Sequence, residues 1–130
     1  MIRGVNRVVL TVDDQERARK FWTEKLGFSV ATDAAYGDDQ RWLEVASPDG
    51  QASIVLSKRM PGQRDTREEV PTELPTASFF LYADDVERTY RELADVGVTF
   101  PAPPSKQPWG WWSMFEDSEG TRIALGQRGE

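Results

Sequence analysis

Cysteine and histidine are both absent from this chain of 130 residues. Without cysteine the chain can form no disulfide, no thiolate metal site and no cysteine nucleophile. Without histidine it lacks the commonest general base, the commonest transition-metal ligand and the base of every serine–histidine triad. These two absences exclude more catalytic chemistry than any motif in the sequence indicates.

Positive charge and long apolar runs are also scarce. There are 16 basic and 22 acidic residues, which give a net charge of −6, so we expect no nucleic-acid partner and a weak preference for cationic ligands. No apolar run approaches the roughly 18 residues that a membrane-spanning helix needs. The first residues lack the apolar stretch of a signal peptide. We therefore expect a cytoplasmic protein with no membrane partner.

An internal repeat is the main feature that the sequence contains. A strand ending at Val12 is followed by Asp13-Asp14, helical spacing from Ala18 to Leu26, Gly27 and a new strand over 28–30. The pattern returns 71 residues later, with a strand over 79–82, Asp84-Asp85, a helix to Val96, Gly97 and a strand over 98–100. Each Asp pair is typical of a helix N-cap, and each glycine of a C-cap.

The downstream segments repeat as well. Residues 41–46 lead through Asp49-Gly50 into a strand over 52–56, and residues 111–116 lead through Glu119-Gly120 into a strand over 122–125. An acidic residue followed by glycine between two alternating runs is a hairpin signal. Each half is therefore predicted to be one strand, one helix and three strands, with modules at 1–57 and 77–130.

Two segments lie outside this pattern. The first is the linker at 58–76, which is either a solvated connection or a lid over a site. The second, over 101–110, contains four prolines and is predicted to be a rigid extended loop that brings Trp109 to the rim of a binding site.

These motifs resemble the vicinal oxygen chelate superfamily, which includes glyoxalase I, extradiol dioxygenases and bleomycin-resistance binding proteins. The resemblance covers essentially the whole chain and is carried by NRVVLTVDDQERARKFWTEKLGF, FFLYADDVERTYRELADVGVTF and PWGWWSMFEDSEGTRIAL. It implies an α+β fold in which two βαβββ modules curl their mixed sheets into a cup-shaped half-barrel with the helices outside. It also implies a homodimer.

Metal-dependent members of this superfamily take ligands from the first and last strands of each module. The resemblance places those positions at Arg7 and Val55 in the first module and at Ser78 and Ala124 in the second. A guanidinium, two apolar side chains and a hydroxyl are unsuited to a catalytic divalent cation. We therefore expect no metal and no other cofactor.

Strand alternation assigns one face of each module to the cup. In the first strand this face carries Arg7, Val9 and Thr11, while Val8, Leu10 and Val12 face the helices. A lining rich in aromatic rings with few polar groups suits a planar or amphipathic organic molecule. The predicted ligand-binding residues are Arg7, Trp42, Glu44, Val55, Ser78, Phe80, Tyr82, Trp109, Trp112, Met114 and Ala124.

Three functions remain open at this stage. The first is a metal-independent protein that binds or sequesters an aromatic or cationic compound. The second is a lyase, isomerase or dioxygenase-like enzyme with a metal-free acid–base site, for which Glu44 and Tyr82 are the candidate catalytic residues. The third is a catalytically inactive interaction module. For Glu44 the alternatives are an ion pair with Arg7, contact with a ligand, and a general base whose pKa is raised by an apolar cup.

Overall fold

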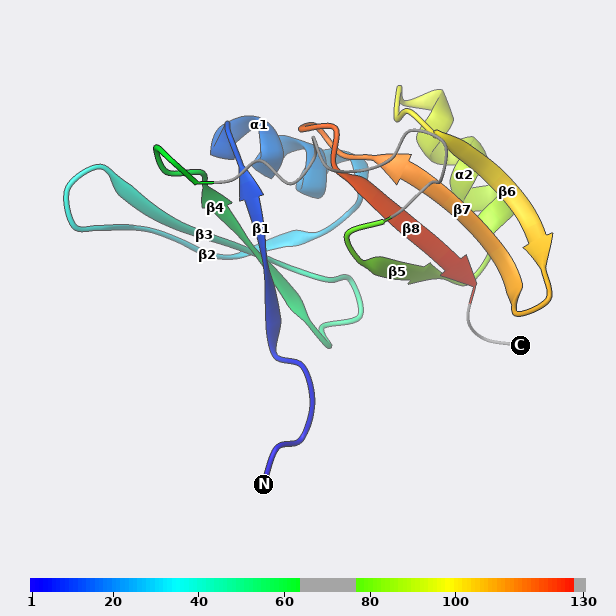
Figure 1. The fold of residues 1–130 in the computed structure, drawn as a ribbon, viewed down its shortest axis with the longest axis horizontal. Helices are drawn as coiled ribbons and strands as arrows, with labels where there is room; N and C mark the ends of the chain where they lie inside the picture. Colours follow the sequence, from blue (N-terminus) through cyan, green and yellow to red (C-terminus); the bar gives the residue numbers. More distant parts are fainter. Residues whose placement is uncertain (64–76, 128–130) are drawn as a thin grey trace. The chain divides into compact units, whose positions relative to one another are not determined.

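The computed structural model describes residues 1–63 and 77–127. Residues 1–63 form one compact unit, and the described residues that follow form a second. The predicted linker at 58–76 lies mostly outside the described residues. The first unit contains β1 (Arg7–Val12), α1 (Gln15–Lys20), the π-helical turn η1 (Phe21–Lys25), β2 (Ser29–Tyr36), β3 (Gln40–Ala46) and β4 (Ser53–Lys58) (Figure 1). The second contains β5 (Phe80–Ala83), α2 (Val86–Asp95), β6 (Ala102–Gln107), β7 (Gly110–Glu116) and β8 (Arg122–Gln127).

Both units have the same topology. Their strand orders are β1-β4-β3-β2 and β5-β8-β7-β6, and in each sheet the first strand runs parallel to the last while the other pairs are antiparallel. The chain is thus an α+β protein with a duplicated βαβββ module, as the repeat predicts. No helix within 1–63 or 77–127 has the length and apolar character needed to cross a membrane.

Each helix begins directly after the second aspartate of its Asp pair, and this aspartate is its N-cap. Asp14 accepts a hydrogen bond from the backbone N–H of Arg17, and Asp85 accepts one from that of Arg88, both at 3.0 Å. Each bond supplies an acceptor for a backbone N–H of the first helical turn, which has no acceptor within the helix. The predicted N-caps are confirmed.

Removing one cap should destabilise the second unit measurably. Asp85→Ala is expected to lower the free energy of unfolding by about 1 kcal/mol, because the Arg88 N–H loses its acceptor. Chemical denaturation checks this value. Asp84→Ala, which removes the neighbouring exposed carboxylate, is the control and should change stability by less than about 0.5 kcal/mol. Equal losses in both variants would contradict the capping role.

The predicted turns also have matching geometry. The Ser47 N–H donates to the Ala52 carbonyl at 2.9 Å, and the Asp117 N–H donates to the Thr121 carbonyl at 3.0 Å. Gly50 and Gly120 lie between them with φ values of 72° and 81°, a region that favours glycine. The acidic-glycine signals therefore mark true hairpin turns in both units.

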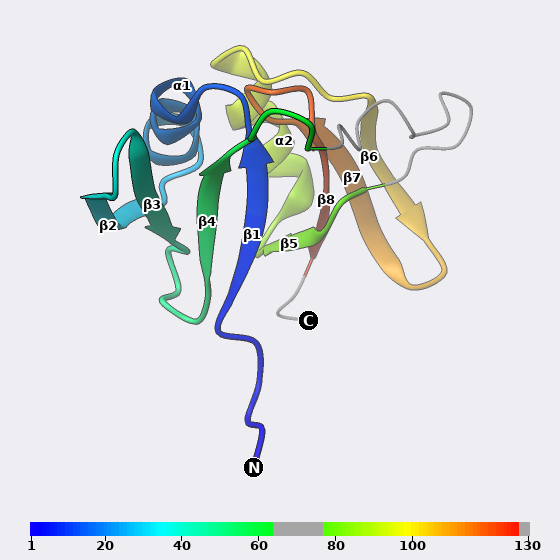
Figure 2. The ribbon, with the colours of Figure 1, turned by 60° about the vertical axis from the view of Figure 1, so that its left-hand side comes forward.

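The helices cover one face of each sheet. α1 contacts β3 and β4, and α2 contacts β5, β6, β7 and β8. In the first strand Leu10 and Val12 are buried as predicted, but Val8 is partly exposed. Figure 2 shows α1 near the C-terminal end of β1, so Val8, at the other end of the strand, lies beyond the cover of this short helix.

The proline-rich segment differs from its prediction. Residues 98–100 are not a strand, and the strand lies instead at 102–107, where an extended loop was predicted. Pro103 and Pro104 fall where the β6–β7 register shifts. β6 is an edge strand, and within the described residues no strand lies on its outer side. A proline whose nitrogen faces that side removes no hydrogen bond from the sheet. An edge position therefore lets a proline-rich segment pair as a strand.

Candidate functional site

The face of each sheet opposite its helix carries most of the predicted site residues. In the first unit Arg7 pairs with Ser53, and Val9 and Glu44 both pair with Val55. Residues in register point to the same face of a sheet. This register agrees with the strand alternation read from the sequence, and it places Arg7, Glu44 and Val55 on one face of neighbouring strands.

Glu44 is the centre of a polar cluster on this face. Its Oε2 accepts hydrogen bonds from Ser53 Oγ at 2.5 Å and from Arg7 Nε at 3.2 Å, and its Oε1 accepts one from Trp42 Nε1 at 3.1 Å. The Glu44 side chain is only 8% exposed, whereas that of Arg7 is 45% exposed. We call Arg7, Trp42, Glu44 and Ser53 the Glu44 cluster.

These contacts answer the question that the sequence left open for Glu44. The hydrogen bond from Ser53 is the largest influence and lowers the pKa of Glu44; burial raises it, and Trp42 and Arg7 lower it further. The net direction is downward, because donors aimed at the carboxylate favour its charged form. The lowered pKa does not support the third alternative for Glu44, a general base with a raised pKa. The ion pair with Arg7 is the alternative that the structure contains.

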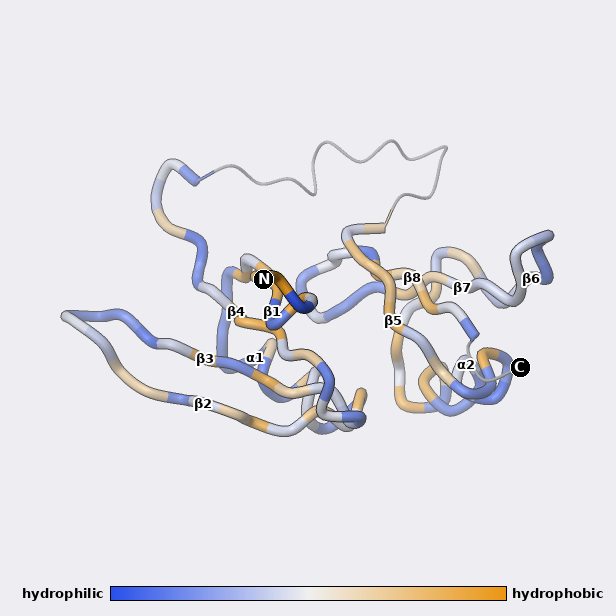
Figure 3. The backbone as a smooth tube through the Cα atoms, turned by 90° about the horizontal axis from the view of Figure 1, so that it is seen from below, coloured by the Kyte–Doolittle hydropathy of each residue, from blue (hydrophilic) through white to orange (hydrophobic). Residues whose placement is uncertain are grey.

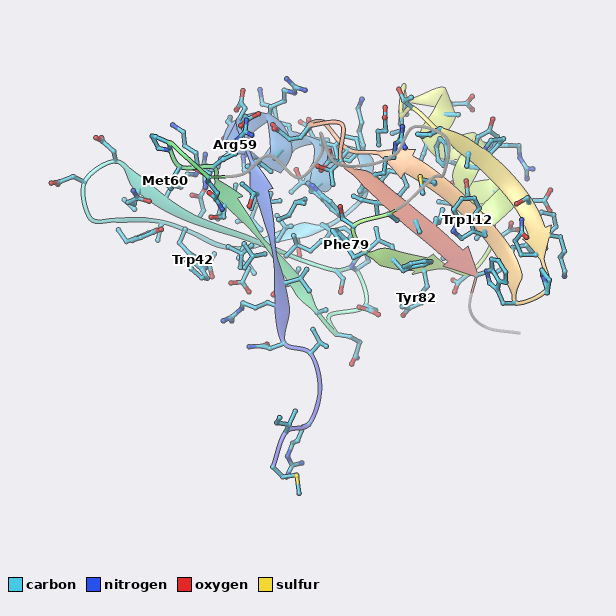
Figure 4. All side chains as sticks on the ribbon, in the orientation of Figure 1. Trp42, Arg59, Met60, Phe79, Tyr82 and Trp112 are labelled. Atoms are coloured by element: carbon cyan, nitrogen blue, oxygen red, sulfur yellow. The ribbon has the colours of Figure 1, made fainter. Side chains whose placement is uncertain are left out.

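Trp42 is held at the edge of this cluster. Its indole N–H bonds to Glu44, and its ring contacts that of Tyr36 edge-on with centroids 6.4 Å apart. Trp42 nevertheless remains 38% exposed, and Figure 4 shows it projecting from β3. An exposed ring with a fixed orientation offers a stacking surface at a low cost in conformational entropy.

In the second unit the corresponding face is mainly apolar. Phe80, Ala124 and Met114 form one row across β5, β8 and β7, and Tyr82, Gly126 and Trp112 form the next. Figure 3 shows that β5 is predominantly hydrophobic, yet Phe80 is 69% and Tyr82 42% exposed. Ala124 and Met114 are buried, as is Val55 in the first unit.

Two predicted residues lie apart from these rows. Ser78 precedes β5 and is exposed, and its backbone N–H donates to the Arg122 carbonyl at 2.9 Å. Trp109 lies in the turn between β6 and β7 and is 74% exposed. A cavity shared by the two units, with Trp109 at its rim, stays a prediction.

Sequence reasoning missed two residues of these faces. Ser53 was not counted as a site residue, because its contact with Glu44 depends on how β3 and β4 pair. Gly126 was not considered. The signal that could have found it is a glycine within an otherwise regular strand, since glycine weakens strands unless something requires it.

The sequence and the geometry together define a duplicated βαβββ protein of the glyoxalase type. The family model of the Glyoxalase/Bleomycin resistance protein/Dioxygenase superfamily matches residues 4–125, and the chain belongs to this superfamily. YetH of Bacillus subtilis (strain 168) is 32% identical over 127 residues, which cover 96% of this chain and 98% of YetH.

Solved structures give the same assignment. UcmS2 superposes with a TM-score of 0.83 at 31% identity, covering 98% of this chain and 100% of its own. TnmS3, an antibiotic binding protein from Streptomyces sp. CB03234, superposes with a TM-score of 0.78 at 33% identity, covering 98% of both chains.

The residues that the resemblance places at the superfamily's metal positions do not fit a divalent cation. Arg7 is a fixed cation already bonded to Glu44, Val55 and Ala124 are buried apolar side chains, and Ser78 offers one neutral hydroxyl. Within residues 1–63 and 77–127, no three carboxylates lie close enough together to hold a metal ion. The donor set is thus unsuited to the Lewis-acid chemistry of the superfamily's enzymes.

Proposed function

We propose that this protein binds a small aromatic molecule reversibly, and that it favours cationic members of that class. Membership of the superfamily supports this proposal, as does 33% identity to TnmS3, an antibiotic binding protein. The observation that carries it is Trp42, an exposed ring that a buried and ionised carboxylate holds in place.

The chemistry of the Glu44 cluster favours binding over catalysis. A carboxylate with three donors and a lowered pKa is a weak base. The cluster instead has the features of a ligand-positioning site, in which a few fixed polar groups border an apolar stacking surface. The net charge of −6 adds a long-range attraction for cations that salt will screen.

A titration with two tricyclic probes of opposite charge tests this function. We expect saturable binding of 9-aminoacridine, a planar cation, and weaker binding of anthraquinone-2-sulfonate, a planar anion, by isothermal calorimetry at low salt. Trp42→Ala should weaken acridine binding by about tenfold, because one stacking contact of about 1–1.5 kcal/mol is lost.

Trp111→Ala is the matched control. Trp111 faces the opposite side of β7 from Trp112 and lies beneath the ammonium group of Lys106, 5.8 Å from its ring centroid. This variant should bind acridine within twofold of the wild type. Absence of saturable binding for both probes would contradict the proposal. Equal effects of Trp42→Ala and Trp111→Ala would exclude Trp42 from the binding site.

A further inference from the structure

The turn between β3 and β4 contains the only Asp-Gly pair of the chain, Asp49-Gly50. The backbone nitrogen of such a glycine can attack the Cγ atom of the aspartate, because no Cβ hinders the approach. The new C–N bond closes a five-membered succinimide ring, and one water molecule leaves. Water then opens the ring at either carbonyl, which restores aspartate or gives isoaspartate, whose main chain runs through the former side chain.

The folded turn holds the attacking nitrogen. Asp49 and Gly50 are exposed, so water reaches both. The Gly50 N–H donates to the Ser47 carbonyl at 2.9 Å and closes a β-turn over 47–50. Serine at the first position, proline at the second and glycine at the last all favour such a turn. The nitrogen has to lose the proton of this hydrogen bond before it can attack, so the turn opposes the reaction.

The carboxylate of Asp49 is held as well. Its Oδ1 accepts hydrogen bonds from Ser47 Oγ at 2.6 Å and from the Gln51 N–H at 2.9 Å. Ser47 Oγ also lies 2.9 Å from the Ala52 carbonyl and accepts from the Ala52 N–H at 3.3 Å. The serine is thus anchored to both ends of the turn. Ring closure needs the carboxylate to rotate toward the Gly50 nitrogen, and these hydrogen bonds resist that rotation.

The second unit has a turn of the same kind without the reactive pair. The Gly120 N–H donates to the Asp117 carbonyl at 3.1 Å, and the residue before this glycine is Glu119. Glutamate at this position would have to close a six-membered ring, which forms far more slowly than a five-membered one. The fold therefore accepts the longer acid in this turn, and an aspartate at position 49 is not a requirement of the fold.

The turn also joins the two strands that carry the centre of the Glu44 cluster. Ala46 pairs with Ser53, and Glu44 pairs with Val55. Ser53 Oγ lies 2.5 Å from Glu44 Oε2. Isoaspartate at position 49 adds one carbon atom to the main chain between Ala46 and Ser53. A modification outside the cluster would therefore disturb the contact between Ser53 and Glu44.

We propose that Asp49-Gly50 is a site of spontaneous isoaspartate formation, and that the folded turn, through Ser47, slows the reaction. The inference does not depend on the proposed function, because it involves no ligand. It gives Ser47 a role in preserving the covalent structure of the turn and, through the turn, the Glu44 cluster.

The test is a time course of peptide mapping on the whole protein at neutral pH and body temperature. Asp49 is the only aspartate of the tryptic peptide 42–58, so a second peak of the same mass reports this site. We expect isoaspartate to form about tenfold faster in guanidinium chloride than in the folded protein, because the hydrogen bonds to both reacting groups are released. Ser47→Ala should accelerate the reaction in the folded protein about fivefold, because the carboxylate loses one donor.

Ser29→Ala is the matched control, since it removes an exposed hydroxyl from β2 and should age at the wild-type rate. Asp49→Glu should give no second peak. Equal rates in folded and unfolded wild type would overturn the restraint, and equal rates in Ser47→Ala and Ser29→Ala would exclude Ser47 from it. Absence of the peak in the unfolded wild type would reject the site. If Ser47→Ala does not fold, the comparison of folded and unfolded wild type decides.

Urea denaturation of the isomerised fraction, separated by ion exchange, tests the link to the Glu44 cluster. We expect this fraction to unfold at a lower urea concentration than fresh protein. Equal midpoints would overturn the link.

Discussion

Glu44→Ala is expected to lower the free energy of unfolding by about 3 kcal/mol. The substitution removes the common acceptor of Ser53, Trp42 and Arg7, and it leaves a hydroxyl and a guanidinium beside a small void. Glu44→Gln keeps the shape and one acceptor oxygen, so its loss should be about 1–2 kcal/mol. Urea denaturation at neutral pH measures both values.

The same residue predicts a dependence of stability on acid. The folded-state pKa of Glu44 is lowered relative to about 4.3 in an unfolded chain. Its contribution is therefore fully present above about pH 4.3 and is lost as the pH falls through the folded-state value. Between pH 7 and pH 3 the wild type should lose more stability than Glu44→Gln, which has no proton to gain.

The control for both experiments is Glu92→Ala. Glu92 lies on the exposed face of α2 and is 3.7 Å from Arg88 in a solvent-accessible pair, so its removal should change stability by less than about 0.5 kcal/mol. A Glu44→Ala variant as stable as this control would show that the Glu44 cluster adds nothing to the fold.

Trp22→Ala is expected to cost about 4 kcal/mol, the largest loss from a single side chain in the first unit. Trp22 has no exposed surface. Its ring contacts Phe28 edge-on with centroids 4.9 Å apart, and Phe21 with centroids 6.1 Å apart. Its removal leaves a cavity beneath the π-helical turn at Phe21–Lys25 that its rigid neighbours cannot fill.

Thermal and urea denaturation of Trp22→Ala and Trp109→Ala give the comparison. Trp109 is the same residue type in an exposed turn, and its substitution should alter the free energy of unfolding by less than about 0.5 kcal/mol. Similar losses in the two variants would contradict the assignment of Trp22 to the core.

Local patterns explain why much of the fold could be predicted. The Asp pairs, the C-cap glycines and the acidic-glycine turns act over three to five residues, so their effect does not depend on distant parts of the chain. The β6 strand was misplaced for the opposite reason. Proline disfavours a strand locally, and only the edge position of this segment makes pairing with β7 acceptable.

For the site residues too, local patterns predicted some features and only the tertiary structure shows the others. Alternation along β1 and β3 placed Arg7 and Glu44 on one face, because side chains in a strand alternate with a period of two. It could not choose between an ion pair and a base, since the three donors around Glu44 come from three different strands. The neighbours of Gly126 are known only when β5 and β7 are seen to place Tyr82 and Trp112 beside it.

The sequence by itself determined the duplication, the α+β class, the N-caps of both helices and the absence of histidine and cysteine chemistry. These properties depend on residue type and short spacing. Only the tertiary structure shows that Glu44 forms an ion pair with Arg7 and that Gly126 lies in register between Tyr82 and Trp112. Both depend on strand register, which brings together residues dozens of positions apart and is fixed only when whole sheets form.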